Sequence, residues 1–370
     1  MADNHRIALT RRDWLAAGSA TMLAGLALPA IGEPEAANAR VRLNLNENAF
    51  GPSPRVAQAI AANLKGLERY VEQVEVDALV AQIARLEQVR PDQIVIGEVL
   101  EPLGLHLARK RTGGGTFVYS APGYTALIDA AEPLGGVGVA VPLNSRLEND
   151  LPALGRAIDG RTLAVNLVNP HNPSGTVNDR QALDAFIRET AKRTLVVVDE
   201  AYLEYDDLAQ RSAIRLVREG LNVLVFRTLA KIYGLAGLSI GYAVTSTKLA
   251  ADLRAAGIGA PHSLSRLALV AASAALGDQS HVRAVRGQSV AERTRITQAL
   301  DTLGIEHSNS AANFVFFRTP AFGKVRAAFD AHRIEVGRPF PPLDEWIRVT
   351  VGLPKQNDAA LKVLREALGR

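Results

Sequence analysis

Residues 227–242 read Arg-Thr-Leu-Ala-Lys-Ile-Tyr-Gly-Leu-Ala-Gly-Leu-Ser-Ile-Gly-Tyr, and the rest of the chain is organised around them. The apolar run Leu221–Phe226 predicts a buried strand leading in, and Leu238–Val244 predicts a return strand. The turn between them carries Lys231, flanked by apolar and aromatic residues. Apolar surroundings favour a neutral lysine amine, and only the neutral amine attacks a carbonyl carbon. Lys231 is thus a candidate Schiff-base lysine, although this window also fits a solvated loop lysine.

The composition limits the classes of protein. The chain has 370 residues, 48% of them hydrophobic, which suffices for a large core and about two domains. It has no cysteine, so it has no disulfides or thiolate metal sites, and we expect no bound metal. The net charge is +4, but the basic residues are scattered, so we do not expect nucleic acid binding.

The first 39 residues have the layout of an export signal. Arg11-Arg12 precede a mildly apolar segment, Ala16–Ile31, and Ala37-Asn38-Ala39 offers an A-x-A cleavage site. The paired arginines resemble the twin-arginine class. We therefore expect residues 1–39 to be a signal peptide and the mature protein to be periplasmic, with no membrane attachment after cleavage. An amphipathic first helix with a chance Arg-Arg pair is the alternative.

Short apolar runs then alternate with helical patterns. The expected strands are Ile94–Gly97, Thr116–Ser120, Val137–Leu143, Leu163–Val168 and Leu195–Val198, besides the two already named. The expected helices are Val56–Leu67, Val74–Leu86, Val99–Ala108 and Asp179–Lys192. Continuous apolar strands bounded by helices predict an α/β fold, with a mainly parallel central sheet and helices on both faces.

The pattern changes after about residue 260 and predicts a smaller α+β C-terminal domain. Its expected elements are a long helical region at Leu264–Leu303, strands at Phe314–Arg318 and Trp346–Val351, and a final helix at Asn357–Leu368. We divide the mature chain into an N-terminal arm that packs with the small domain (40–66), a large domain (67–260) and the small domain (261–370).

Polar residues gather at the carboxyl ends of the expected strands, where open α/β sheets bind ligands. In chain order these are Gly97-Glu98, Tyr124, Asn169–Gly175, Asp199–Tyr202 and Lys231. Asp199 ends an apolar run, so its carboxylate needs a cation or donors, although alone it also fits a helix N-cap. Asn169–Gly175 reads Asn-Pro-His-Asn-Pro-Ser-Gly, which alone fits an ordinary turn.

The order of these residues resembles the fold-type-I aminotransferases that use pyridoxal 5′-phosphate (PLP), in particular the histidinol-phosphate aminotransferase-like branch. The residues that carry the resemblance are Tyr124, Asn172, Asp199, Tyr202, Lys231 and Arg348, within Val-Asp-Glu-Ala-Tyr (198–202) and Arg-Thr-Leu-x-Lys-x-x-Gly-Leu-Ala-Gly-Leu (227–238). It covers residues 44–352, essentially the whole mature chain. It implies the PLP-transferase fold type I and transfer of an amino group between an amino acid and a 2-oxo acid.

The resemblance also implies a role for each matching residue. Lys231 holds PLP as a Schiff base and then moves the proton at the substrate Cα. Asp199 pairs with the pyridine nitrogen, which makes the ring an electron sink. Asn172 and Tyr202 bind the phenolic oxygen of the cofactor. Tyr124 stacks on the ring, although alone it fits a core tyrosine.

Further residues are assigned to the substrate and to a partner subunit. Arg348 resembles the clamp for the substrate α-carboxylate, although alone it fits an arginine in a surface ion pair. We also assign Asn48 to substrate binding. Tyr70 matches a tyrosine that reaches the cofactor phosphate of a neighbouring subunit, which implies a homodimer.

Three departures from the family fall on the cup for the cofactor phosphate. The usual serine before the lysine is Ala230, and the usual arginine eight residues after it is Ser239. The Gly-rich cup is replaced by residues 97–102, Gly-Glu-Val-Leu-Glu-Pro. We assign Glu98, Val99 and Ser239 to cofactor binding. Loss of an arginine–phosphate contact weakens binding by roughly ten- to a hundredfold.

Three functions therefore remain open. A PLP-dependent transaminase is favoured, the alternatives being an exported PLP-dependent racemase or lyase, and a catalytically silent homologue that only binds a small ligand. Residues 337–342 supply no clear arginine for a substrate phosphate, and we expect Arg338 to be exposed to solvent. We therefore do not name histidinol phosphate as the substrate.

Overall fold

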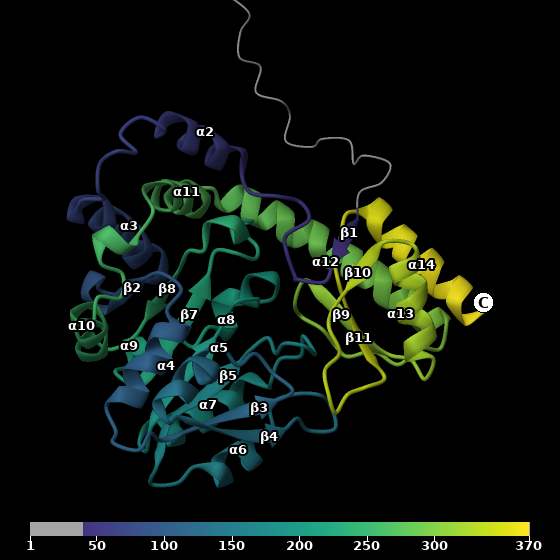
Figure 1. The fold of residues 1–370 in the computed structure, drawn as a ribbon, viewed down its shortest axis with the longest axis horizontal. Helices are drawn as coiled ribbons and strands as arrows, with labels where there is room; N and C mark the ends of the chain where they lie inside the picture. Colours follow the sequence, from purple (N-terminus) through teal and green to yellow (C-terminus); the bar gives the residue numbers. More distant parts are fainter. Residues whose placement is uncertain (1–39, 370) are drawn as a thin grey trace, which may run out of the picture. The chain divides into compact units, whose positions relative to one another are not determined.

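The apolar runs between residues 94 and 244 form one seven-stranded sheet in the computed structural model, which describes residues 40–369 (Figure 1). The spatial order is β2-β8-β7-β6-β5-β3-β4. The strands are β2 (Ile94–Ile96), β3 (Thr116–Ala121), β4 (Val137–Pro142), β5 (Thr162–Val168), β6 (Leu195–Asp199), β7 (Val223–Thr228) and β8 (Gly241–Val244). Strands β4, β3, β5, β6 and β7 are parallel, whereas β8 is antiparallel to β7 and to β2. The predicted mainly parallel sheet is confirmed.

Both faces of the sheet are buried at its central strands, β6 and β7, which explains why these strands are mainly apolar. Along β6, Val197 belongs to one hydrophobic core, whereas its neighbours Val196 and Val198 belong to the other. The first core is covered by α4 (Leu100–Arg109), α5 (Ala126–Ala131) and α10 (Thr247–Ala255). The second is covered by α2 (Pro54–Ala62), α3 (Gln73–Glu87), α6 (Leu151–Ala157), α7 (Arg180–Ala191), α9 (Ile214–Arg218) and α11 (Arg266–Leu276).

A separate hydrophobic core lies in the C-terminal part of the chain. Its strands are β9 (Phe314–Arg318) paired antiparallel with β11 (Trp346–Thr350), and β1 (Val41–Leu43) paired parallel with β10 (Ile334–Val336). Its helices are α12 (Gln279–Thr302), α13 (Phe322–Ala331) and α14 (Pro354–Leu368), seen beside these strands in Figure 1. The N-terminal arm thus contributes a strand, where the sequence predicted only an extended segment.

Some element boundaries differ from the expected ones. The long helical region divides into α11 and α12 because Asp278 caps α12, accepting a hydrogen bond from the His281 amide at 3.2 Å. Ser53 also donates to Asp278 at 2.6 Å, which ties the arm to this helix boundary. Helix α11 packs in the larger core with α2 and α3. The division at residue 260 stays a prediction.

The predicted signal, residues 1–39, lies outside the described residues. Within residues 40–369, no helix combines the length and the apolarity that are needed to cross a membrane.

Candidate active site

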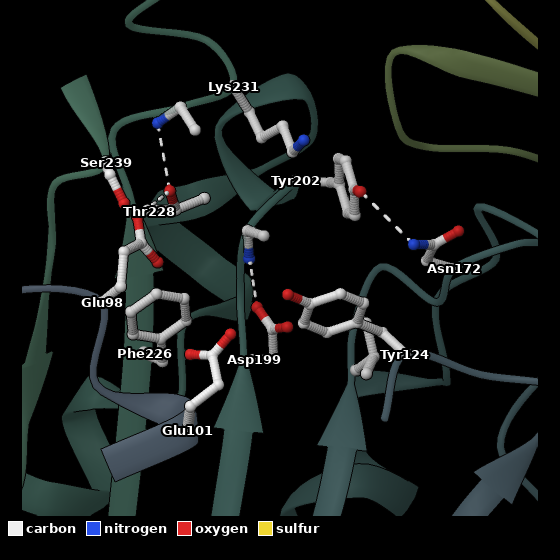
Figure 2. A pocket seen from close by; sticks show the side chains of 13 residues that line it. Glu98, Glu101, Tyr124, Asn172, Asp199, Tyr202, Phe226, Thr228, Lys231 and Ser239 are labelled. Carbon is white, nitrogen blue, oxygen red and sulfur yellow. Dashed lines mark hydrogen bonds between the residues drawn. The ribbon is translucent and has the colours of Figure 1, made fainter. Parts of the chain in front are cut away.

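The carboxyl ends of β5, β6 and β7 open into a cavity of about 300 Å³ (Figure 2). It is lined by Glu98, Glu101, Tyr124, Val168, Asn172, Asp199, Ala201, Tyr202, Phe226, Thr228, Ala230, Lys231 and Ser239. Seven predicted site residues therefore meet in one place: Glu98, Tyr124, Asn172, Asp199, Tyr202, Lys231 and Ser239. Parallel strands bring their carboxyl ends to the same edge, so the topology alone assembles this set.

Lys231 lies in the turn after β7 with its side chain directed into the cavity (Figure 2). Its Nζ donates to the Leu45 carbonyl at 3.3 Å and lies 5.8 Å from the centre of the Tyr202 ring. The turn packs closely against the N-terminal arm, since Gly234 has φ +72° and a Cβ there would lie 2.7 Å from the Pro52 nitrogen. The N-terminal arm therefore forms a wall over the lysine.

Asp199 is the last residue of β6 and is 3% exposed. Its Oδ1 accepts a hydrogen bond from the Ala201 amide at 3.0 Å. The pKa of Asp199 is raised to about 7, mainly by burial and also by the charge of Glu98, while the Ala201 hydrogen bond and Lys231 act in the opposite direction. A buried carboxylate that faces a cavity is suited to a cationic ligand group such as a protonated ring nitrogen.

Two asparagines hold the hydroxyl of Tyr202. Asn46 donates to it at 3.0 Å from the N-terminal arm, and Asn172 reaches it at 3.5 Å from the loop after β5. The Tyr202 ring packs edge-to-face against Phe314, with ring centres 5.1 Å apart. The phenol is therefore fixed at the cavity wall, where its hydroxyl can bind a ligand oxygen.

Aromatic rings flank the buried carboxylate. Figure 2 shows the rings of Tyr124 and Phe226 beside Asp199, and Phe226 is the strand partner of Asp199 in β7. Burial and the nearby carboxylates of Glu101, Asp199 and Glu98 raise the pKa of Tyr124, so it stays neutral. A flat heteroaromatic ring fits this surface.

Arg348 is not in the cavity wall but adjoins it. It donates to the Asn172 side-chain oxygen and, at 2.6 Å, to the Asn44 carbonyl. Its guanidinium lies over the rings of Phe314 and Phe340, 5.4 and 5.1 Å from their centres, and its buried Nε has no partner. Burial lowers the pKa of Arg348. Such a buried guanidinium is prepared for an anion.

The opposite end of the cavity is acidic. Glu98 accepts a hydrogen bond from the Thr228 hydroxyl at 3.1 Å, and Glu101 lies in the first turn of α4. Ser239 adopts a left-handed conformation with φ +46°. Of the lining residues that the structure describes, only Lys231 carries a positive charge. The cavity thus fits the ring of PLP, whereas its phosphate end lacks the expected cation.

Besides Arg348, three of the predicted site residues do not line the cavity. The side chain of Val99 is buried in the core with Leu103, and its assignment to cofactor binding stays a prediction. Tyr70 is 85% exposed. Asn48 donates to the Gly51 and Ile232 carbonyls and accepts from the Phe50 amide, so it braces the turn beside Lys231.

Sequence reasoning missed three residues of the site, namely Asn46, Phe226 and Thr228. Asn46 has φ +57° and stands in the Asn-Leu-Asn-Glu-Asn run that we read only as an arm. Phe226 and Thr228 both lie in β7, but from the sequence we read Phe226 as the last residue of a buried strand and Thr228 as part of the turn after it. The position of Thr228 three residues before Lys231 was the available signal.

The chain is similar to known aminotransferases over nearly its whole length. The family model "Aminotransferase class I and II" matches residues 39–366. A histidinol-phosphate aminotransferase of Lactiplantibacillus plantarum is 33% identical over 329 residues, covering 88% of this chain and 91% of the relative. An aromatic amino acid aminotransferase of Streptomyces coelicolor is 34% identical over 342 residues, covering 90% and 93%.

Solved structures agree with these relatives. Histidinol-phosphate aminotransferase from Sinorhizobium meliloti, in complex with pyridoxal 5′-phosphate, superposes with a TM-score of 0.80 at 29% identity, covering 89% of this chain and 91% of that one. The chain belongs to the aminotransferase class I and II family. Its fold is the PLP-transferase fold type I, and it is an enzyme that uses PLP to transfer an amino group between an amino acid and a 2-oxo acid.

Proposed function

We propose that the cavity of Figure 2 is the active site and that Lys231 is the amine that bonds to PLP. The observation that carries this proposal is that the Lys231 amine and the buried carboxylate of Asp199 line one ring-sized cavity. The bound cofactor supplies an electron-withdrawing ring that stabilises negative charge at the substrate Cα. Lys231 Nζ holds the proton that leaves Cα, and Asp199 accepts a hydrogen bond from the ring nitrogen.

We propose that Arg348 binds the substrate α-carboxylate. Its buried Nε is free to donate, and its bond to Asn172 places the guanidinium next to a residue of the cavity wall. The same bond orients Asn172, whose amide supports Tyr202 at the cofactor's phenolic oxygen. Arg338 is exposed as predicted, and its guanidinium lies 4.8 Å from the centre of the Phe340 ring. We therefore assign Arg338 no contact with the amino acid substrate.

Trapping of the cofactor tests the role of Lys231. Borohydride reduction of the loaded protein, followed by peptide mass mapping, is expected to place a pyridoxyl group on Lys231. Lys231→Ala removes that adduct. The control is Lys248→Ala, which replaces an exposed lysine of α10 and is expected to leave the adduct on Lys231 unchanged. A pyridoxyl group on another lysine of the wild-type protein contradicts the proposal.

We also propose a homodimer in which Tyr70 reaches the cofactor site of the partner subunit. The support is an exposed apolar group near the end of α2 and the start of α3, in which Leu64 and Leu67 are each 54% exposed, Val74 is 66% exposed and Tyr70 is 85% exposed. Sedimentation equilibrium is expected to give the mass of two chains. Tyr70→Phe is expected to keep the dimer and to weaken PLP binding; a monomer with full PLP affinity refutes the proposal.

Export by the twin-arginine route is proposed from the sequence. Arg11-Arg12, the apolar segment and Ala37-Asn38-Ala39 support it, and the family match leaves residues 1–38 uncovered. Twin-arginine export moves folded proteins, so PLP would be inserted before export. Replacement of both arginines by lysine is expected to retain the precursor in the cytoplasm, whereas normal export of that variant refutes this route.

A further inference from the structure

The acidic end of the cavity differs from the family pattern, which implies a serine and an arginine for the cofactor phosphate at this place. Glu98 stands between β2 and α4, and its carboxylate accepts the Thr228 hydroxyl at 3.1 Å. Thr228 in turn accepts a hydrogen bond from the Ala230 amide at 3.1 Å. Figure 2 shows Glu98, Thr228 and Ser239 grouped on one side of the cavity. Ala230 and Ser239 occupy the sequence positions of the usual phosphate-binding serine and arginine, so this side receives the 5′ substituent of the cofactor.

The charges around Glu98 oppose a phosphate. Glu101 faces it from α4, Asp199 from β6 and Tyr124 from the loop after β3, while Lys231 is the cation that faces it. A phosphate carries a charge of about −1.5 to −2 at pH 7. Like charges in a half-buried site repel strongly because water screens them poorly there. An ionised Glu98 therefore disfavours a phosphate and accepts a hydrogen bond from a hydroxyl.

We propose that Glu98 selects the 5′ substituent of the cofactor: ionised, it repels the phosphate of PLP and accepts a hydrogen bond from the 5′-hydroxyl of pyridoxal. The site thus binds the unphosphorylated cofactor form nearly as well as PLP. This inference rests on the proposed role of Lys231, which anchors both forms through the same carbonyl carbon.

Protonation of Glu98 removes the discrimination. Burial raises the pKa of Glu98, the Thr228 bond opposes this shift, and the negative charge of Glu101 adds to it. The protonated acid donates a hydrogen bond to a phosphate oxygen instead of repelling it. The preference for PLP over pyridoxal therefore rises as the pH falls through the titration of Glu98.

Cofactor titrations test the proposal without an activity assay. The cofactor-free protein is titrated with PLP and with pyridoxal, and binding is followed by absorbance and by borohydride trapping on Lys231. The ratio of the two dissociation constants is compared among wild type, Glu98→Gln and the control Glu189→Gln, which removes the same charge from an exposed position of α7 outside the cavity. Free pyridoxal forms an internal hemiacetal and free PLP titrates, but both effects are the same for every variant and therefore cancel in that comparison.

The expected result is a wild-type preference for PLP below about tenfold at pH 8. Glu98→Gln raises this preference at least tenfold and removes its excess pH dependence, while Glu189→Gln changes it less than threefold. A wild-type preference above about a hundredfold that Glu98→Gln leaves unchanged overturns the inference, yet leaves Lys231 as the anchor. Failure of both ligands to label Lys231 overturns the proposed function as well.

A second variant tests the proposal if Glu98→Gln does not fold. Ser239→Arg places a cation on the same side of the cavity, and we expect it to tighten PLP binding by ten- to a hundredfold while leaving pyridoxal binding within threefold. Slower loss of PLP on dialysis reports the same effect. Equal tightening of both forms, or of neither in a folded variant, overturns the assignment of this end to the 5′ substituent.

Discussion

The guanidinium of Arg348 donates a hydrogen bond to the side-chain oxygen of Asn172, although the two residues lie 176 positions apart. The nitrogen of the same amide reaches the Tyr202 hydroxyl at 3.5 Å. Asn172 therefore connects Arg348, in the C-terminal part of the chain, to Tyr202, which lines the cavity at the edge of the central sheet. If Arg348 binds the substrate carboxylate as proposed, this connection would place the carboxylate beside the cavity.

Arg348→Gln is expected to weaken substrate binding. Loss of a charge-assisted contact to the α-carboxylate reduces kcat/KM by about 10- to 100-fold, mainly through KM. PLP binding stays within about threefold. Steady-state kinetics and cofactor titration measure both quantities. Arg338→Gln, at the exposed arginine that stacks on Phe340, is the matched control, and an equal loss there argues against the clamp.

Asp199→Asn is expected to stabilise the cofactor-free protein and to weaken its affinity for PLP. Burial raises the pKa of Asp199 to about 7 from an unfolded value of 3.8. The neutral acid therefore contributes stability fully below about pH 3.8, and this contribution is lost as the pH rises through about 7. Asparagine stays neutral, so the cofactor-free variant gains about 1–4 kcal/mol over wild type at pH 8. Urea unfolding measures the gain, and PLP is expected to stabilise the variant less than wild type.

Glu204→Gln is expected to flatten the pH dependence of unfolding. Glu204 is buried and accepts from Arg227 at 3.2 Å, and burial raises its pKa to about 7 from 4.5. The stability that its neutral form provides is thus complete below about pH 4.5 and lost as the pH rises through about 7. Arg227 also donates to Glu200 at 3.0 Å, and we expect the variant to keep this ion pair. The free energy of unfolding, relative to wild type, should rise by about 1–3 kcal/mol from pH 5 to pH 8. The exposed Glu189→Gln is the control and should show no such trend.

Gly234→Ala is expected to destabilise the turn that carries Lys231. The positive φ costs about 1 kcal/mol or more for alanine, and the added Cβ would lie 2.7 Å from the Pro52 nitrogen. We expect a loss of at least about 2 kcal/mol in unfolding free energy and a lower kcat. Gly237→Ala, where nothing lies within 4 Å of the added Cβ, should change stability by less than about 0.5 kcal/mol. Similar losses in both variants would mean that the turn and the arm are not in close contact.

The sequence predicted the central sheet well because its strands are buried on both faces and read as continuous apolar runs. It predicted β9 at its observed bounds, Phe314–Arg318. Strands β1 and β10 were missed because three-residue strands have no usable periodicity and their pairing joins the two ends of the chain. Lys231, Asp199 and Tyr202 were found because each stands at or shortly after the end of an apolar run. Asn46 was missed because its contact with Tyr202 depends on how the arm folds back.

The pairing of β1 with β10 determines when the active site can be completed during synthesis. Arg40, just before β1, bonds to Glu335, which is 295 residues further along the chain. Leu45 follows β1 closely and supplies the carbonyl that receives Lys231. A nascent chain whose central sheet has left the ribosome before β10 therefore has the pocket without the wall that the N-terminal arm forms in the finished protein. Nascent chains truncated before residue 334 should therefore exchange PLP faster than the finished protein.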